Sequence, residues 1–162
     1  MVHTHRFSTL PRTAHSVPFV ELRQSLPSKV AAISTFVDQL MRFILKFRRA
    51  DGSEGEIEMA IHEGITNAVI HGNGENSSKR VYVTCRCYTD GEVSITVRDE
   101  GRGFDSSAVP DPTSSENLLF THGRGIYLME ALMDEVCFEE GGTVVMMRKK
   151  SNASSAEGSK RQ

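Results

Sequence analysis

The amino-acid sequence predicts an α+β fold, a two-layer sandwich in which helices cover one face of a mostly antiparallel sheet. The 162 residues, 38% of them hydrophobic, suffice for one ordinary domain with its own core. The expected elements follow the order strand, helix, helix, hairpin, loop, helix, hairpin, without an internal repeat. Because hairpins pair neighbouring strands antiparallel, this order favours an antiparallel sheet over alternating parallel units.

The first part of the chain predicts a strand and a long amphipathic helix. The run VPFVEL, from Val17, is of β type and ends before Pro27. Between Lys29 and about Phe47, apolar residues recur at spacings of three and four, which is typical of one helix stripe. That stripe, expected in the core, consists of Val30, Ile33, Val37, Leu40, Met41, Ile44 and Leu45.

A second helix is expected from about Glu54 to His71. Ser53, with Glu56 three positions later, has the pattern of a capping box. The residues of Gly72–Gly74 tolerate the left-handed conformation with which helices end. The apolar residues expected to face the sheet are Met59, Ile61, Ile65, Ala68 and Val69.

A hairpin is expected in the middle of the chain. Apolar residues alternate with polar ones from Val81 to Cys87 and from Val93 to Val97, around the turn at Asp90-Gly91. This pattern predicts one buried face.

The last part of the chain predicts a loop, a short helix and a second hairpin. Residues 105–122 have little periodicity, and so long a loop in a compact domain is usually functional. A helix is expected from Gly125 to Met133. The hairpin pairs Val136–Phe138 with Thr143–Met147 around two glycines.

Composition narrows the partners and the compartment. Nineteen Lys and Arg against 21 Asp and Glu give a net charge of −2, which provides no bulk field to gather nucleic acid or an anionic membrane. No apolar run approaches the ~20 residues that span a bilayer, so we expect a cytoplasmic protein. The three cysteines are expected to be ordinary thiols. We expect a flexible polar extension over residues 1–16, one domain over 17–150 and a disordered tail over 151–162.

The first chemical motif lies on the second helix. Glu63, Asn67 and His71 follow at spacings of four, which places them along one side of a helix over about 12 Å. Such a line faces either solvent or a ligand. In the second case the Asn67 amide oxygen suits Mg²⁺, and Glu63 can act as a base on an incoming hydroxyl.

The second motif, DEGRGF, follows the first hairpin from Asp99 to Phe104. The Asp99 carboxylate can accept a hydrogen bond from an exocyclic amine such as that of adenine. Gly101 and Gly103 permit a planar base to approach the backbone. A plain glycine-rich turn is the alternative.

The third motif is Gly123-Arg124-Gly125, running into a helix expected to begin near Ile126. The N–H groups and positive dipole end of a helix start bind phosphate, and Arg124 can add a charge-assisted contact. A glycine hinge before a buried helix is the alternative.

Together and in this order, the motifs resemble the N-box, G1 box and G2 box of the GHKL (Bergerat-fold) ATPases, which include gyrase and the histidine-kinase catalytic domains. The matching stretches are EGITNAVIHGN from Glu63, DEGRGFD from Asp99 and GRGIYLM from Gly123. Within that superfamily, HEGITNAVIHG, VRDEGRGFD and GRGIYLMEALMDEV resemble bacterial anti-sigma-factor serine kinases of the RsbW and SpoIIAB type. The resemblance covers about residues 17–149.

The resemblance implies a role for each matched position. Asn67 would hold Mg²⁺, Glu63 would be the catalytic base, and Asp99 would recognise the adenine amine. His71 matches a common residue of this subfamily, either as a nucleotide contact or in packing at the helix end. Residues 106–122 resemble an ATP lid. The remaining expected nucleotide contacts are Gly101 and Gly103 at the base, Gly123, Arg124 and Gly125 at the phosphates, and Thr143 near adenine.

The resemblance implies an ATP- and Mg²⁺-dependent serine/threonine kinase that phosphorylates a STAS-type anti-anti-sigma protein and sequesters a sigma factor, as a homodimer. Two alternatives stay open: a nucleotide-regulated binding module with little catalysis, and a stand-alone ATPase or histidine-kinase catalytic domain. Glu63 disfavours the first, because a pure binder needs no base beside the metal ligand. The lack of a preceding helix pair with a phosphoacceptor histidine disfavours a complete histidine kinase.

Overall fold

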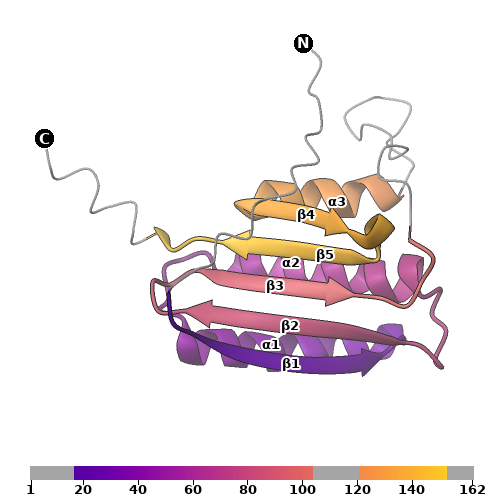
Figure 1. Ribbon diagram of the computed structural model, residues 1–162, viewed down its shortest axis with the longest axis horizontal. Helices are drawn as coiled ribbons and strands as arrows, with labels where there is room; N and C mark the ends of the chain where they lie inside the picture. The colour runs from indigo at the N-terminus through magenta and orange to yellow at the C-terminus, as the bar shows by residue number, and fades with distance from the viewer. Residues whose placement is uncertain (1–16, 104–120, 153–162) are drawn as a thin grey trace, which may run out of the picture.

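The structure is a computed structural model that describes residues 17–103 and 121–152. Within this part, a five-stranded antiparallel sheet of order β1-β2-β3-β5-β4 is covered on one face by helices (Figure 1). The predicted fold class and element order are confirmed. The strands are β1 (Phe19–Pro27), β2 (Arg80–Tyr88), β3 (Val93–Arg98), β4 (Glu135–Glu139) and β5 (Val144–Lys149). The helices are α1 (Ile33–Phe47), α2 (Glu54–Thr66) and α3 (Thr121–Leu132), with short helical turns η1 (Val30–Ala32), η2 (Asn67–Gly72) and η4 (Glu140–Gly142).

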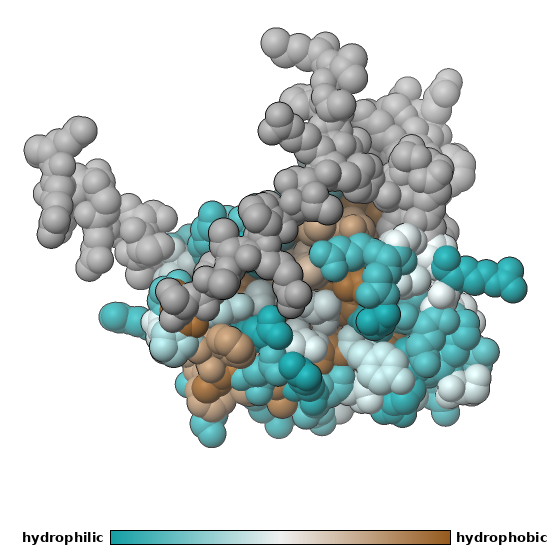
Figure 2. Space-filling view, in the orientation of Figure 1, coloured by the Kyte–Doolittle hydropathy of each residue, from teal (hydrophilic) through white to brown (hydrophobic). Residues whose placement is uncertain are grey.

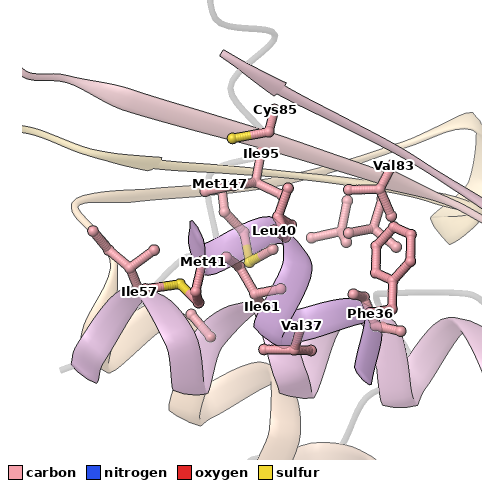
Figure 3. Packing of buried hydrophobic residues seen from close by; sticks show 14 of the residues in the cluster. Phe36, Val37, Leu40, Met41, Ile57, Ile61, Val83, Cys85, Ile95 and Met147 are labelled. Atoms are coloured by element: carbon pink, nitrogen blue, oxygen red, sulfur yellow. The ribbon is translucent and has the colours of Figure 1, made fainter. Parts of the chain in front are cut away.

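Helix α1 packs much of the predicted stripe into the core (Figure 3). Its buried residues are Ile33, Phe36, Val37, Leu40, Met41 and Ile44. Two members of the predicted stripe are wrong, since Val30 is 48% exposed and Leu45 is 54% exposed. Val30 lies in η1, before the α-helix begins, and Leu45 is turned about 100° from its buried neighbour Ile44. Phe36 takes a core position that the spacing did not single out.

Helix α2 begins at Glu54 as predicted, but the capping box is wrong. Ser53 makes no side-chain cap bond; its Oγ donates to Asp51 Oδ1 at 2.6 Å. The Asp51 N–H donates to the Glu54 carboxylate at 2.8 Å, while Glu56 pairs with Lys149 of β5. The reason is tertiary, because the guanidinium of buried Arg48 donates to both Asp51 and Ser53 and so fixes the loop.

The sheet-facing side of α2 is otherwise as expected. Ile61, Ile65, Ala68 and Val69 are buried, whereas Met59 is 49% exposed and its predicted burial is wrong. Its neighbour Ala60 occupies the core side instead. Beyond Thr66 the helix widens into a π-type turn, η2, in which the Asn73 N–H donates to the Ala68 carbonyl five residues back at 2.8 Å. The chain then leaves through Gly74 at φ 64°, in agreement with the predicted stop.

Both predicted hairpins are confirmed, and the helix-facing side of the sheet is buried. Figure 3 shows Val83, Cys85, Ile95 and Met147 directed from the strands toward α1 and α2. Burying a side chain of this size contributes about 1.5–3 kcal/mol, so the two layers are held mainly by this contact. The cysteines are free thiols, as expected. The buried residues of the first hairpin's inner face are Val81, Val83, Cys85, Cys87, Val93, Ile95 and Val97.

Hydrophilic residues cover much of the opposite face of the sheet, and hydrophobic residues also show near the middle of that view (Figure 2). A hydrophobic patch lies at the lower left of that view, where β1 begins. Phe19 and Val20 open β1 and are 46% and 38% exposed. Along the described residues no helix is long and apolar enough to cross a bilayer.

Helix α3 begins at Thr121, four residues before the predicted start at Gly125. The glycine-rich motif therefore lies inside the first turns of the helix, and the expectation that it precedes the helix is wrong. The predicted extension over residues 1–16 lies outside the described residues, as does most of the predicted loop. Of the predicted tail, Ser151 is buried and the Asn152 N–H donates to Asp51 at 2.8 Å.

Candidate functional site

The three motifs meet at one end of the sheet. The end of α2 with η2, the end of β3, the start of α3 and the η4 turn before β5 all lie at the right-hand side of Figure 1. Segments more than 60 residues apart in the sequence thus contribute to one region, as the contacts below establish.

The first contact joins α3 to the polar side of α2. A β-carbon placed on Gly125 would lie 2.9 Å from Oε2 of Glu63 and 3.1 Å from Nδ2 of Asn67. Glu63 and Asn67 are both half-buried, and Gly125 is buried between them and the rest of its helix. The absence of a side chain at Gly125 therefore allows the start of α3 to approach the carboxylate and amide. Two of the three residues predicted to line a site on α2 are brought together with the third motif.

The second contact surrounds Asp99, which follows β3 directly. β-Carbons on Gly72 and on Gly101 would both collide with the Asp99 carboxylate or the backbone beside it. The Asp99 N–H donates to the Thr143 carbonyl at 3.0 Å, and Oδ1 accepts the Gly101 N–H at 2.7 Å. The carboxylate is thus held on a fixed backbone, in a cradle whose walls carry no side chains.

Burial raises the pKa of Asp99 above that of an ordinary carboxyl group. The Gly101 N–H and the positive charge of Lys79 act in the opposite direction without cancelling this effect. A half-buried carboxylate of this kind gains more from a hydrogen-bond donor than an exposed one, because water competes less for it.

The last strand pair closes the same region. A β-carbon on Gly103, which has φ 75°, would collide with the carbonyl oxygen of Gly141. Thr143 precedes β5 by one residue and so lies at the end of η4 rather than on the strand where it was expected. Its Oγ1 donates to the Glu140 carbonyl at 3.0 Å, while its own carbonyl fixes Asp99.

The remaining predicted residues occupy the margin of this region. His71 lies in η2 and is exposed. Gly123 and Arg124 lie in the first turn of α3, and Arg124 is exposed. The first N–H groups of any helix lack partners within the helix and lie at its positive dipole end. The backbone groups that suit a phosphate are therefore those of the turn that begins at Thr121.

Asn73 is a residue of this region that the sequence identified only as part of a helix stop. It is 4% exposed, and its side chain bonds to three separate segments. In sequence an Asn between two glycines is typical of a turn, and nothing local distinguishes a buried one.

The chemistry of these groups fits a magnesium nucleotide. The Asn67 amide oxygen is a hard donor that suits Mg²⁺, which takes one or two protein oxygens and keeps phosphates and water as its other ligands. Glu63, one helical turn earlier, places a carboxylate beside it. The start of α3 faces them across Gly125. The cradle around Asp99 provides a hydrogen-bond acceptor that is held among closely packed backbone.

Comparison with known proteins agrees with this chemistry. Residues 25–149 match the family model of the histidine kinase-like ATPase domain. The chain is 38% identical to the anti-sigma F factor of Heyndrickxia coagulans over 97 residues, which cover 57% of this chain and 66% of that protein. It is 33% identical to the serine-protein kinase RsbW of Staphylococcus epidermidis over 143 residues, which cover 81% of this chain and 86% of that protein.

A solved structure supports the fold alone. The crystal structure of the RsbU and RsbW domains of Rv1364c from Mycobacterium tuberculosis aligns with a TM-score of 0.56 at 22% identity. The alignment covers 82% of this chain and 32% of that one.

Proposed function

Because this chain belongs to the family of histidine kinase-like ATPase domains, we propose that it is an ATP-dependent serine kinase that also acts as an anti-sigma factor. The observation that carries the proposal is the approach of Gly125 to Glu63 and Asn67, which brings a base and a metal ligand to the start of a helix. The relatives named as serine kinases and anti-sigma factors support the same assignment.

In this proposal the adenine of ATP lies against Asp99. The carboxylate accepts a hydrogen bond from the exocyclic amine. Gly101 and Gly103 lie beside it, where the absence of side chains lets their backbone pack against the carbonyls of Gly72 and Gly141. Thr143 contributes near the base, since its carbonyl fixes the Asp99 backbone at 3.0 Å. His71 lies on the adjoining turn, where it can contact the nucleotide or pack at the helix end.

The phosphates lie over the start of α3. Gly123, Arg124 and Gly125 bring backbone close to them, and the helix dipole and the Arg124 charge favour anions there. Asn67 presents its amide oxygen to Mg²⁺. When bound, Mg²⁺ neutralises charge that develops on the transferred phosphoryl group.

Glu63 acts on the attacking hydroxyl. One helical turn from Asn67, its carboxylate takes the proton of a serine hydroxyl while the serine oxygen bonds to the γ-phosphorus and the bond to the ADP oxygen breaks. The Glu63 side chain is only half-buried, and in this proposal its exposed part meets the protein substrate.

We assign the phosphate acceptor to an anti-anti-sigma protein of the STAS type and the second partner to a sigma factor. ATP and ADP would bias which of the two is held, through different affinities for the two states of the protein. The functional unit is a homodimer acting in the cytoplasm. These assignments rest on the names of the relatives and on the family resemblance.

The kinase assignment is tested with purified protein, Mg-ATP labelled at the γ-phosphate, and a STAS-domain protein from the same source. We expect acid-stable label on the STAS protein, since phosphoserine survives acid and phosphohistidine does not. Glu63→Gln should reduce the rate about 10²–10⁴-fold, as for loss of a general base. Glu58→Gln, on the exposed side of α2, is the matched control and should retain the rate. ATP that is bound without turnover would instead favour the binding-module alternative, and acid-labile label would favour a histidine phosphoacceptor.

A further inference from the structure

Asn73 is a buried polar residue that joins three segments around the end of β3. Its Nδ2 donates to Ser28 Oγ at 2.6 Å and to the Arg80 carbonyl at 2.9 Å. Its Oδ1 accepts the Glu100 N–H at 2.8 Å. Ser28 is fully buried and follows β1, while Arg80 opens β2. The side chain therefore uses its acceptor and both donor hydrogens in one geometry.

The acceptor side of Asn73 bears directly on Asp99. Glu100 is the residue next to Asp99, so its N–H belongs to the peptide unit that leaves the Asp99 α-carbon. The other side of Asp99 is fixed by its own N–H, which donates to the Thr143 carbonyl. Asn73 and Thr143 therefore hold the two peptide units that flank the aspartate, while the Gly101 N–H holds its carboxylate oxygen Oδ1.

A second bond to Glu100 cannot replace that of Asn73. The Glu100 carboxylate accepts the Arg80 N–H at 2.5 Å, but this side chain is exposed, so water competes for the bond and it restrains the backbone weakly. The Asn73 side chain is buried, its bond to Ser28 is buried and its bonds to Arg80 and Glu100 are partly buried, so water competes less for them and an unmade bond is costly. Unlike Asp or Leu, which are similar in size, Asn carries an acceptor and two donor hydrogens on one planar group.

We propose that Asn73 is a positioning residue for base selection: it orients Asp99 toward the exocyclic amine of the nucleotide. This inference rests on the proposed function, because it requires that Asp99 accepts a hydrogen bond from that amine. It predicts that loss of Asn73 weakens the recognition of the amine specifically and leaves the phosphate and metal contacts unchanged.

Two nucleotides separate this role from a merely structural one. ATP carries the amine, and purine riboside 5′-triphosphate lacks it but keeps the ring, the sugar and the phosphates. Binding of each is measured by calorimetry with Mg²⁺ for the wild type, Asn73→Ala and Ser28→Ala. Asn76→Ala is the matched control, since Asn76 is an exposed Asn of the same loop whose side chain accepts hydrogen bonds from Ser78.

The wild type should prefer ATP over the analogue. Asn73→Ala should weaken ATP binding about tenfold and change binding of the analogue less than about twofold, as expected for loss of one well-oriented hydrogen bond. Ser28→Ala removes one anchor of the Asn73 amide and should give a smaller loss in the same direction. Asn76→Ala should bind both nucleotides like the wild type. At saturating ATP the turnover number of Asn73→Ala should stay near that of the wild type, because Glu63 and Asn67 lie elsewhere.

Equal weakening of both nucleotides, or none, in Asn73→Ala would overturn the inference while the proposed function stood. If Asn73→Ala fails to fold, Ser28→Ala carries the same comparison, and an unchanged preference there overturns it. A wild type that binds both nucleotides equally would instead remove the role of Asp99 on which the inference rests.

Discussion

Gly125 lies so close to Glu63 that a β-carbon on the glycine would be 2.9 Å from the carboxylate oxygen Oε2. The two residues belong to α3 and α2, and their approach brings the start of one helix to the polar side of the other. The proximity requires glycine at position 125, and it brings the predicted base next to the glycine-rich motif.

Gly125→Ala should lower phosphoryl transfer more than it lowers stability. The new methyl group meets the flexible end of the Glu63 side chain, which can move aside at little cost to the fold but then no longer faces the substrate. We expect a loss of at least about tenfold in rate, since misplacement of a catalytic group by 1 Å is costly. Gly55→Ala is the control, because a β-carbon there meets nothing within 4 Å. It should keep full activity, and a Gly125→Ala protein as active as that control would argue against the site.

Asn67→Ala should abolish the magnesium dependence of nucleotide binding and leave the fold unchanged. Asn67 is half-buried at the end of α2, so truncation removes a ligand without opening the core. Titration of the variant with ATP, with and without Mg²⁺, checks this together with thermal unfolding. Normal enhancement of binding by Mg²⁺ in the variant would contradict the assigned ligand.

Much of this arrangement could be predicted from local patterns, and the exceptions have tertiary causes. The helix stripes and the alternating strands depend on burial periodicity, which the sequence carries directly. The start of α2 differs because Arg48, the residue after α1, donates to the Gly91 carbonyl at 2.8 Å as well as to Asp51, a set of contacts that no local motif reveals. The chain from Thr121 looks like a loop in sequence, yet it is helical where it packs on α2 through Gly125.

The π-type turn η2 is a second feature that local sequence patterns do not predict. Its widening is accompanied by the bond from the Asn73 N–H to Ala68, and the Asn73 side chain is fixed by Ser28 and Arg80. These partners are distant in sequence. Glu63 and Asn67 could be singled out by their spacing of four and Asp99 by the glycines that follow it, whereas Asn73 could be noted only as part of a helix stop.

Asp99→Asn should weaken ATP binding and, at neutral pH, raise the free energy of unfolding. Burial raises the pKa of Asp99, so the folded protein holds this proton more tightly than the unfolded chain and ionisation costs stability. This loss of stability is absent below the ordinary carboxyl pKa of about 3.9, and it develops as the pH rises through the raised pKa of Asp99 in the folded protein. Urea unfolding at pH 7 and near pH 3 checks the sign. A variant less stable than the wild type at pH 7 would contradict it.

Asp51→Asn should destabilise the protein at neutral pH by about 3–5 kcal/mol, as for a broken buried ion pair. The Asp51 side chain is 6% exposed and accepts two bonds from Arg48, whose side chain is 1% exposed. Burial alone would raise the pKa of Asp51, but hydrogen bonds from Ser53, the Asn152 N–H and Arg48 outweigh it and hold the pKa well below the usual range.

The pH dependence of that effect has a defined sign. A lowered pKa contributes stability that is present above the unfolded value of about 3.9 and is lost as the pH falls toward the folded value. The difference in the free energy of unfolding between the wild type and Asp51→Asn should therefore become smaller below about pH 4. Asp38→Asn, on the exposed side of α1, should stay within about 0.5 kcal/mol of the wild type. A difference in the free energy of unfolding that does not change with pH would show that it does not come from the Asp51 charge.

In the proposed complex, one magnesium nucleotide binds between Asn67, Asp99 and the start of α3. A crystal structure with Mg²⁺ and a non-hydrolysable ATP analogue tests it most directly. We predict the Asn67 amide oxygen on the metal, the adenine amine on the Asp99 carboxylate and the phosphates over the turn that contains Gly125. A nucleotide bound elsewhere, or with its base away from Asp99, would contradict the account.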